Sequence, residues 1–331
     1  MLPSLNDLTA TARVISLPLA TKFRGITERE ALVFEGPQGW SEFSPFLEYD
    51  DAEASAWLAA AIDFAWEPTP ALVRDTVPIN ATMPAVAAAD VESILARFGA
   101  ARTVKIKVAE LGQTLVDDTA RVARVRELIG PAGRIRVDAN GGWNVDEAEH
   151  AIHTLAPYDL EYIEQPCASV DELAEIRTRV KYMGLPIAAD ESVRKASDPL
   201  EVARAGAADL LVIKAQPLGG VHAALEIVRE AGLPVVVSSA LDTSVGLSMG
   251  AWLAASVPEL DYDCGLGTAS LLAADVTARP VRATGGFIEV ERVELDAALL
   301  AQHAASTERD AWWRARLARC YEVLAEAYRP E

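Results

Sequence analysis

The run RIRVDAN at residues 134–140 and the run LEYIEQP at residues 160–166 decide the fold. Each run has apolar residues at its centre and a carboxylate near its end, Asp138 in the first and Glu164 in the second. Short runs of this kind are typical of buried strands. Residues 145–155, between the two runs, have the apolar spacing of a helix. This order predicts a parallel β-α-β unit with a carboxylate at the end of each strand.

The same alternation extends along the chain in both directions. Strands are predicted at residues 79–83, 104–108, 134–140, 160–166, 186–192, 209–216, 234–239 and 262–267. Helices are predicted between them at residues 87–98, 114–129, 145–155, 170–183, 199–205, 221–231 and 245–256. We therefore predict an α/β fold, a TIM-like (β/α)7β barrel. A doubly wound open sheet is the less favoured alternative, because no G-x-G-x-x-G motif follows an early strand.

The two ends of the chain break this alternation. Near the start, strands are predicted at residues 13–19 and 30–36 and a helix at residues 51–65. Near the end, a strand is predicted at residues 286–293 and an amphipathic helix at residues 308–328. We therefore expect residues 1–75 and 269–331 to build one α+β capping domain on a catalytic barrel at residues 76–268. The segment EPTPA at residues 67–71 is the expected joint.

Charge and cysteine content narrow the class of protein. The 331 residues carry a net charge of −19, and an acidic surface disfavours nucleic-acid binding, which requires a basic face. Three cysteines, Cys167, Cys264 and Cys320, are too few for a disulfide framework. The chain starts without a basic, then apolar, leader, and no run reaches the roughly 18 apolar residues of a membrane span. We expect a cytoplasmic protein without nucleic-acid or membrane partners, and the sequence leaves its oligomeric state open.

Polar residues end five consecutive predicted strands, at steps of 31, 26, 26 and 24 residues: Lys107, Asp138, Glu164, Asp190 and Lys214. In a β/α barrel the carboxyl ends of the strands form the functional mouth, so these side chains should meet there. Three carboxylates without histidine or cysteine form a hard oxygen site, which favours Mg²⁺, with Mn²⁺ as a substitute. The alternative for each carboxylate alone is a helix cap or a strand end.

Lysine is rare in this chain, since only 6 of the 30 basic residues are lysines. Three of them, Lys105, Lys107 and Lys214, lie inside apolar runs, and lysine can release a proton where arginine cannot. Lys107 and Lys214 should face each other across the mouth, because their strands are opposite in an eight-stranded barrel. Lys105 lies on the same face as Lys107, and its charge should favour the neutral amine of Lys107. This set suits removal of a proton next to a carboxylate.

Five motifs resemble the strand-end motifs of the enolase superfamily, muconate-lactonizing subgroup: VKIKV (104–108), RVDAN (136–140), YIEQP (162–166), AADES (188–192) and VIKAQPLGG (212–220). The resemblance covers about residues 79–268. It implies that Asp138, Glu164 and Asp190 bind Mg²⁺, that Lys107 is the acid and base of a K-x-K pair, and that Lys214 opposes it. Arg136 stands where synthases of this family often carry an arginine.

The resemblance also implies a reaction and a substrate class. The expected reaction is the Mg²⁺-dependent loss of water from a small cyclohexadiene dicarboxylate, which gives an aromatic acid. Lys107 would remove the proton next to one carboxylate and protonate the departing hydroxyl, while Lys214 would stabilise the enolate. The candidates for holding the substrate are Arg24, Arg136, Asn140, Ser238, Ser239, Gly265, Gly267 and Thr268.

Alternatives rest on the segment Asp261-Tyr262-Asp263. Dipeptide epimerases of the superfamily use an Asp-x-Asp there to hold a substrate ammonium group. The following CGLGT (264–268) is more similar to the synthases, which favours dehydration. An N-acylamino acid racemase or a cycloisomerase would use the same metal and lysines. A non-enzymatic barrel that binds an anion, with structural carboxylates, is the alternative from another class.

Overall fold

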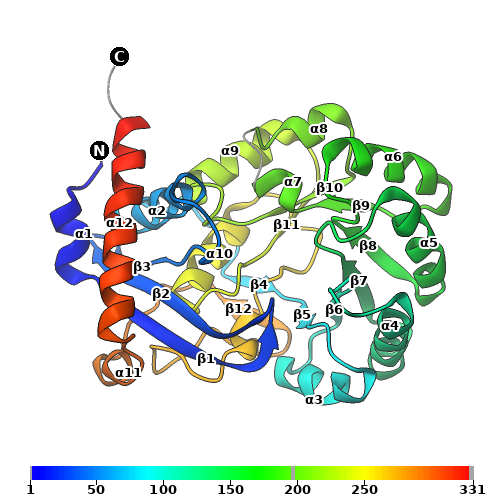
Figure 1. Cartoon of the computed structure of the whole chain (residues 1–331), viewed down its shortest axis with the longest axis horizontal. Coiled ribbons are helices and arrows are strands. Elements are labelled where there is room, and N and C mark those ends of the chain that lie inside the picture. The colour runs from blue at the N-terminus through cyan, green and yellow to red at the C-terminus, as the bar shows by residue number, and fades with distance from the viewer. Residues whose placement is uncertain (1, 195–197, 328–331) are drawn as a thin grey trace.

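The capping domain begins the chain in this computed structural model, which describes residues 2–194 and 198–327 (Figure 1). After helix α1 (Leu5–Thr11), strands β1 (Arg13–Phe23), β2 (Ile26–Gly36) and β3 (Gly39–Phe43) form an antiparallel sheet in sequence order. Helix α2 (Asp51–Trp66) follows, and the Asp50 carboxylate caps it by accepting from the Glu53 amide at 2.8 Å. The predicted strands and helix are present, whereas α1 and β3 were not predicted.

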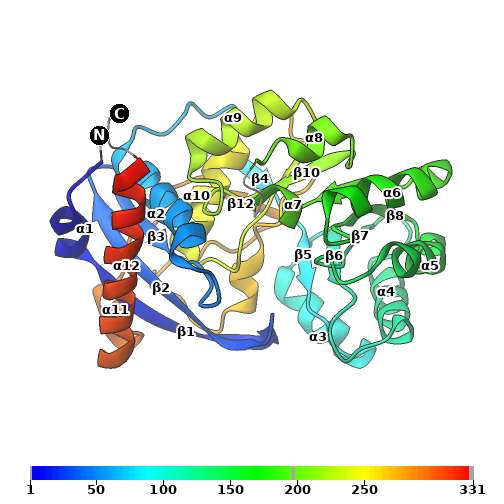
Figure 2. The same cartoon turned by 45° about the horizontal axis from the view of Figure 1, so that its top comes forward.

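The end of the chain returns to the same domain. Helix α12 (Thr307–Ala327) packs against α2, and the ring of Trp313 meets Phe43 edge-on at 5.8 Å. Figures 1 and 2 both show α1, α2, α12 and the small sheet gathered on one side of the barrel. The α+β cap built from both ends is therefore confirmed. The short helix α11 (Ala297–Gln302) was not predicted, and residue 328 of the predicted last helix lies outside the described residues.

Parallel strands form the barrel wall. In the described residues, a sheet runs in the order β11-β10-β9-β8-β7-β6-β5. Its members are β5 (Ala81–Met83), β6 (Thr103–Lys107), β7 (Arg134–Asp138), β8 (Leu160–Glu164), β9 (Ile187–Ala189), β10 (Leu210–Ile213) and β11 (Val235–Val237). Cys264 bridges to Ile79 and Gly265 to Ser238, both in parallel, so the predicted eighth strand closes the ring through single bridges. The predicted barrel is confirmed.

Helices cover the outside of this wall (Figure 1). They are α3 (Val91–Leu95, between 3₁₀ turns Ala88–Asp90 and Ala96–Phe98), α4 (Leu115–Ile129), α5 (Val145–Leu155), α6 (Val170–Val180), α8 (Glu201–Ala205), α9 (Val221–Ala231) and α10 (Ser244–Ser256). Glycines end several of them: for example, Gly184 follows the 3₁₀ turn after α6, and Gly232 follows α9, with φ of +68° and +61°. Such left-handed ends favour glycine. The short helix α7 (Glu191–Arg194), at the mouth, was not predicted.

A two-stranded antiparallel ribbon joins the segment that follows the barrel to the segment that precedes it. Strand β12 (Phe287–Glu289) pairs antiparallel with β4 (Thr76–Pro78). The predicted strand at residues 286–293 is therefore shorter than expected, because its partner β4 offers only three residues for pairing. Among the described residues, no helix combines the length and the apolar character that crossing a membrane requires.

The lower interior of the barrel is filled by apolar side chains. Tyr162, Ala188, Leu210, Val212 and Val236 are at most 1% exposed and pack as one cluster inside the ring. Side chains alternate between the two faces of a strand, so the next inward positions toward the carboxyl ends carry the polar residues of the predicted site. The packed floor thus places those residues at the mouth.

Candidate active site

Strand register brings the predicted catalytic and metal-binding residues together. Lys107 pairs with Asp138, and Asp138 pairs with Glu164 across adjacent parallel strands. Glu164 pairs in turn with Ala188, and Asp190 lies two residues further on the same face. All of these polar side chains are buried at the carboxyl ends of the strands. The register of the parallel strands, together with the period of two along each strand, therefore aligns them.

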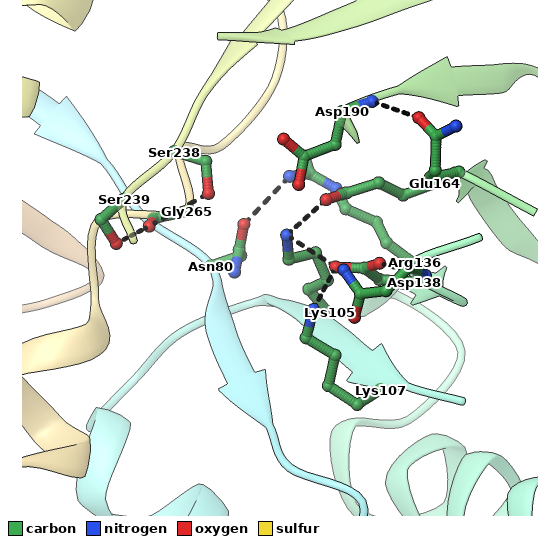
Figure 3. A network of polar contacts seen from close by, with 12 residues as sticks. Asn80, Lys105, Lys107, Arg136, Asp138, Glu164, Asp190, Ser238, Ser239 and Gly265 are labelled. Atoms are coloured by element: carbon green, nitrogen blue, oxygen red, sulfur yellow. Dashed lines mark hydrogen bonds and ion pairs between the residues drawn. The ribbon is translucent and has the colours of Figure 1, made fainter. Parts of the chain in front are cut away.

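Each carboxylate contacts a lysine, and Figure 3 shows the contacts of Lys105 and Lys107 with Asp138 and Glu164. Lys107 Nζ lies 2.6 Å from Asp138 Oδ2 and 2.6 Å from Asn140 Oδ1. Lys105 Nζ lies 2.8 Å from Glu164 Oε1 and 3.2 Å from Asp138 Oδ2. Lys105 thus sits between two carboxylates, and its charge is paired with them rather than acting on Lys107 alone as expected from the sequence.

Lys214 completes the set on the opposite wall. Its Nζ lies 2.5 Å from Asp190 Oδ2, and both Lys107 and Lys214 line the same cavity. Lys107 is 9% exposed and Lys214 is 7% exposed, so both amines are largely shielded from solvent. A ligand in this cavity would be exposed to an amine on each side.

Burial and charge shift the pKa values of these groups in opposite directions. Burial disfavours ionisation of Asp138 and Asp190, but the ammonium groups of Lys107 and Lys214 outweigh it and hold both carboxyl pKa values well below their usual range. Burial, reinforced by the Asp138 carboxylate, raises the pKa of Glu164 to about 8. Burial also lowers the pKa of Lys214 below its ordinary value, although Asp190 opposes that change.

The donor set fits a hard divalent cation. The three carboxylates are at most 1% exposed, and burial, together with the nearby Asp138 carboxylate, holds the pKa of Glu164 high. An added cation would relieve the mutual repulsion of these groups, and carboxylate oxygens are the ligands that Mg²⁺ prefers. As the side chains stand, their oxygens face ammonium groups, and no three acidic, histidine or cysteine residues in the described parts of the chain are gathered closely enough to hold a metal.

Backbone conformations just beyond the strands support the carboxylates. Asn140 and Gln165 both have left-handed φ, +48° and +40°, which is uncommon for residues other than glycine. Gln165 Oε1 accepts from the amide of Asp190 at 2.9 Å, and its Nε2 donates to Ser192 Oγ at 2.7 Å. Gln165 therefore fixes the turn that carries Asp190, a role that the sequence alone did not reveal.

A cavity lies over these groups. Six of the eight predicted substrate-binding residues line it: Arg24, Asn140, Ser238, Ser239, Gly265 and Thr268. Ser239 Oγ lies 2.7 Å from the carbonyl oxygen of Gly265 and 2.8 Å from Thr268 Oγ1, so its hydroxyl is held in place. A Cβ on Gly265 would stand 2.3 Å from Ser238 Oγ, which explains why this position needs glycine.

The other two predicted substrate-binding residues do not reach the cavity. Arg136 is fully buried one inward position below Asp138, where Glu161 Oε2 at 2.5 Å and the carbonyl oxygen of Asp263 at 2.6 Å hold its guanidinium group. Gly267 packs against the barrel wall, since a Cβ there would lie 2.9 Å from the carbonyl oxygen of Asn80. Neither residue lines the cavity. The sequence pattern predicted the face of the strand on which Arg136 lies, but it did not predict how far along the strand the cavity begins.

Several cavity residues were missed in the sequence. Phe23, Phe46, Thr82, Arg194, Ala240 and Leu241 line the cavity as well. Arg194 is the clearest case, since its Nε lies 3.1 Å from Asp190 Oδ1, and its Nη1 donates to Tyr49 Oη at 3.0 Å. Its position four residues after Asp190 is a helical spacing, and this was the one available signal.

Asp263 lies at the opposite end of the barrel from the cavity. Its Oδ2 accepts from Thr103 Oγ1 at 2.6 Å and from Arg134 Nη2 at 2.8 Å, and both donors come from the start of their strands. Asp261 is exposed, and neither aspartate lines the cavity. The Asp-x-Asp segment therefore does not offer a carboxylate to a ligand beside Lys107.

We expect Asp263→Asn to leave kcat/KM within about threefold of the wild-type value, while it lowers the free energy of unfolding by about 1 kcal/mol. The physical reason is that Asp263 joins two strands far from the cavity. Chemical denaturation and steady-state kinetics check the two parts. A loss of turnover of tenfold or more in a folded variant would instead return Asp263 to the active site.

A barrel closed by parallel strands, an α+β cap and a mouth of three carboxylates between lysines define a protein of the enolase type. Residues 86–294 match the family model described as enolase C-terminal domain-like, and residues 14–65 match enolase N-terminal domain-like. The o-succinylbenzoate synthases of Mycobacterium tuberculosis and Mycolicibacterium smegmatis are 53% and 52% identical to this chain, covering 99% and 97% of it and 99% and 98% of their own lengths. The chain belongs to the o-succinylbenzoate synthase family of the enolase superfamily.

Solved structures share the fold. The muconate lactonizing enzyme from Pseudomonas putida matches with a TM-score of 0.74 at 19% identity, over 89% of this chain and 98% of that one. The L-Ala-D/L-Glu epimerase from Bacillus subtilis matches with a TM-score of 0.73 at 24% identity, over 86% and 96%. The family-model matches and the curated relatives confirm the resemblance to the enolase superfamily that was inferred from the strand-end motifs.

Proposed function

We propose that this protein is an o-succinylbenzoate synthase, which dehydrates 2-succinyl-6-hydroxy-2,4-cyclohexadiene-1-carboxylate to 2-succinylbenzoate and water in menaquinone biosynthesis. The observation that carries the proposal is the pair of buried lysines, Lys107 and Lys214, that line one cavity beside Asp190. The close relationship to proteins of that name supports the substrate. Its cytoplasmic location and the absence of nucleic-acid partners stay predictions.

The proposed chemistry needs one proton to move twice. Lys107, as the neutral amine, takes the proton from the ring carbon that bears the carboxylate, and the C–H electrons form an enolate. When the ring C–O bond breaks, Lys107 returns the proton to the departing hydroxyl, which leaves as water. The ring becomes aromatic, and Lys107 ends as it began. Lys214 stabilises the enolate with its charge from the opposite wall.

Asp138, Glu164 and Asp190 are the proposed ligands of Mg²⁺, for which Mn²⁺ could substitute. When bound, the cation supplies positive charge to the carboxylate whose neighbouring carbon is deprotonated. Lys105 contacts two of these carboxylates and so helps to hold their orientation.

The substrate carries a second carboxylate on its succinyl arm, and the cavity offers donors for it. Arg24 supplies a guanidinium group, and Ser238, Ser239 and Thr268 supply hydroxyls. Guanidinium groups suit carboxylates because they can donate two parallel hydrogen bonds. Asn140, whose Oδ1 accepts from Lys107 Nζ, is the proposed contact of the ring substituents.

The alternatives require other features. Epimerisation of a dipeptide would call for an acidic group from the last strand near Lys107 and Lys214, and Asp263 is engaged at the other end of the barrel. Racemisation of an N-acylamino acid would use the same lysines, and remains an alternative activity. A barrel that only binds an anion would not need two buried amines beside its carboxylates.

We expect the purified protein, given Mg²⁺ and the cyclohexadiene acid, to form an aromatic product that ultraviolet absorbance detects. The cavity is lined by cations and hydroxyls that suit a dianion, so an L-Ala dipeptide should not be epimerised. The control is Lys107→Arg, which should form the product at least about 10²-fold more slowly. Faster epimerisation of the dipeptide than dehydration of the acid would replace the synthase with the epimerase.

A further inference from the structure

A buried polar cluster joins the cap to the loop after β11, next to the cavity but outside its lining. Arg29, Glu42 and Ser44 come from the cap, and Asp242 and Thr243 come from the loop. These five residues, called the cap clamp here, are between 0% and 4% exposed. Buried charged and polar groups are retained only when their hydrogen bonds are satisfied, so the partners of this cluster indicate what it holds.

Arg29 binds backbone oxygens of the loop rather than a carboxylate. Its Nε donates to the carbonyl oxygen of Leu241 at 3.0 Å, and its Nη2 donates to that of Ala240 at 3.4 Å. Nη2 also donates to Ser44 Oγ at 3.0 Å and to the Ser44 carbonyl oxygen. One planar guanidinium group thus ties two consecutive loop residues to the cap.

Glu42 holds the same loop from its other end. Its Oε2 accepts from the amides of Thr243 at 3.1 Å and Gly246 at 3.0 Å, at the start of helix α10. A Cβ on Gly246 would lie 3.0 Å from Glu42 Cδ and 2.7 Å from Asp242 Cβ, so glycine permits this approach. A carboxylate of the cap therefore caps a helix of the barrel.

The loop held by these contacts contains an unfavourable backbone conformation. Leu241 has a φ of +63°, in the left-handed region that glycine adopts readily and leucine rarely does. Leu241 and Ala240 both line the cavity that Lys214 also lines. A strained conformation of this kind persists only where surrounding contacts enforce it.

We propose that Arg29 is a positioning residue, which with Glu42 and Ser44 holds residues 240–243 with Leu241 left-handed and so sets one wall of the substrate cavity. Arg29 itself does not line that cavity. The proposal rests on the proposed function only for its kinetic assay, since the conformation of the loop can be followed without substrate.

The test measures the fold-loss of kcat/KM that Arg29→Lys causes in three backgrounds: wild type, Leu241→Ala and Leu241→Gly. Lysine keeps the charge but cannot bind both carbonyl oxygens through a planar fork. Leu241→Ala removes the side chain and keeps the strain, whereas Leu241→Gly removes both. Arg29→Lys should lower kcat/KM about 10-fold in the first two backgrounds, and by at least about threefold less in the glycine background.

Ser44→Ala provides a second, milder variant that removes one hydroxyl and no charge, and its cost should depend on residue 241 in the same way. Arg126→Lys is the matched control, because Arg126 also binds backbone oxygens, those of Tyr158 and Gly133 among them, outside the cap. The effect of Arg126→Lys on kcat/KM should be the same in all three backgrounds. Equal costs of Arg29→Lys and of Ser44→Ala in every background, with folded proteins, would overturn the proposal.

Hydrogen exchange keeps this test separate from the proposed function. Arg29→Lys should accelerate exchange of the amides at residues 240–246 and leave those of the distant helix α5 unchanged. Unchanged hydrogen exchange of the amides at residues 240–246 in Arg29→Lys would also contradict the proposal that the cap clamp holds this loop. A wild-type protein that does not dehydrate the cyclohexadiene acid would contradict the proposed function alone, because the exchange result is independent of turnover.

Discussion

Lys107→Arg is expected to lower turnover by at least about 10²-fold while the protein stays folded, since a positioned general base contributes at least that much. Arginine preserves the positive charge beside Asp138, which Lys107 Nζ contacts at 2.6 Å, but it does not release a proton at neutral pH. Steady-state kinetics measure the loss, and circular dichroism with thermal unfolding checks the fold.

Lys214→Arg is the matched variant for this experiment. It keeps a cation beside Asp190, so it should cost less than Lys107→Arg if Lys214 acts only through its charge. Lys214→Ala removes that charge and should be severe. Equal, severe losses in both arginine variants would mean that Lys214 also transfers a proton, and near-normal turnover of Lys107→Arg would remove Lys107 from the mechanism.

Removal of the divalent cation should abolish activity, and Mg²⁺ or Mn²⁺ should restore it. Asp190→Asn is expected to weaken Mg²⁺ affinity at least about tenfold, since it removes one of three charged oxygen donors. The same change leaves Lys214 and Arg194 facing a neutral amide, so stability should also fall. Isothermal titration with Mg²⁺ measures the affinity directly, without substrate.

Asp275→Asn is the control for this measurement. Asp275 is also a buried carboxylate, but it accepts from Ser244 Oγ at 2.6 Å and does not line the cavity. Its variant should bind Mg²⁺ as the wild type does, even if it is less stable. Full turnover of the wild-type protein in excess chelator would end the metal proposal.

Much of the barrel could be predicted because its strands are covered on both faces and its helices on one. A strand buried on both faces needs a short apolar run, and a helix lying on the barrel needs apolar residues at a period near 3.6, as in α5 and α9. Both signals are local and survive in a single sequence. The elements that were missed, such as α1, β3 and α7, are short, and their positions depend on contacts with distant parts of the chain.

The candidate site also has features that local sequence predicted and features that depend on contacts between distant residues. The spacing of Lys107, Asp138 and Glu164 predicted that they lie together, because each ends a parallel strand. In the structure, Lys107 pairs with Asp138 and Asp138 pairs with Glu164 on adjacent strands. The depth of Arg136 was not predictable, since alternation repeats every two residues and does not say which inward position opens to the cavity. The charge pairing of Lys105 with Glu164 likewise depends on a neighbouring strand.

The sequence by itself determined the fold class and the set of carboxylates and lysines at the mouth, because strand periodicity and strand-end position are local properties. Only the tertiary structure decided which residues close the cavity and which end of the barrel Asp263 faces. The contact of Arg29 with Leu241 spans 212 residues, and no local pattern encodes such a pairing. It forms because the packing of the cap on the barrel brings one buried donor to carbonyl oxygens that would otherwise be left unsatisfied.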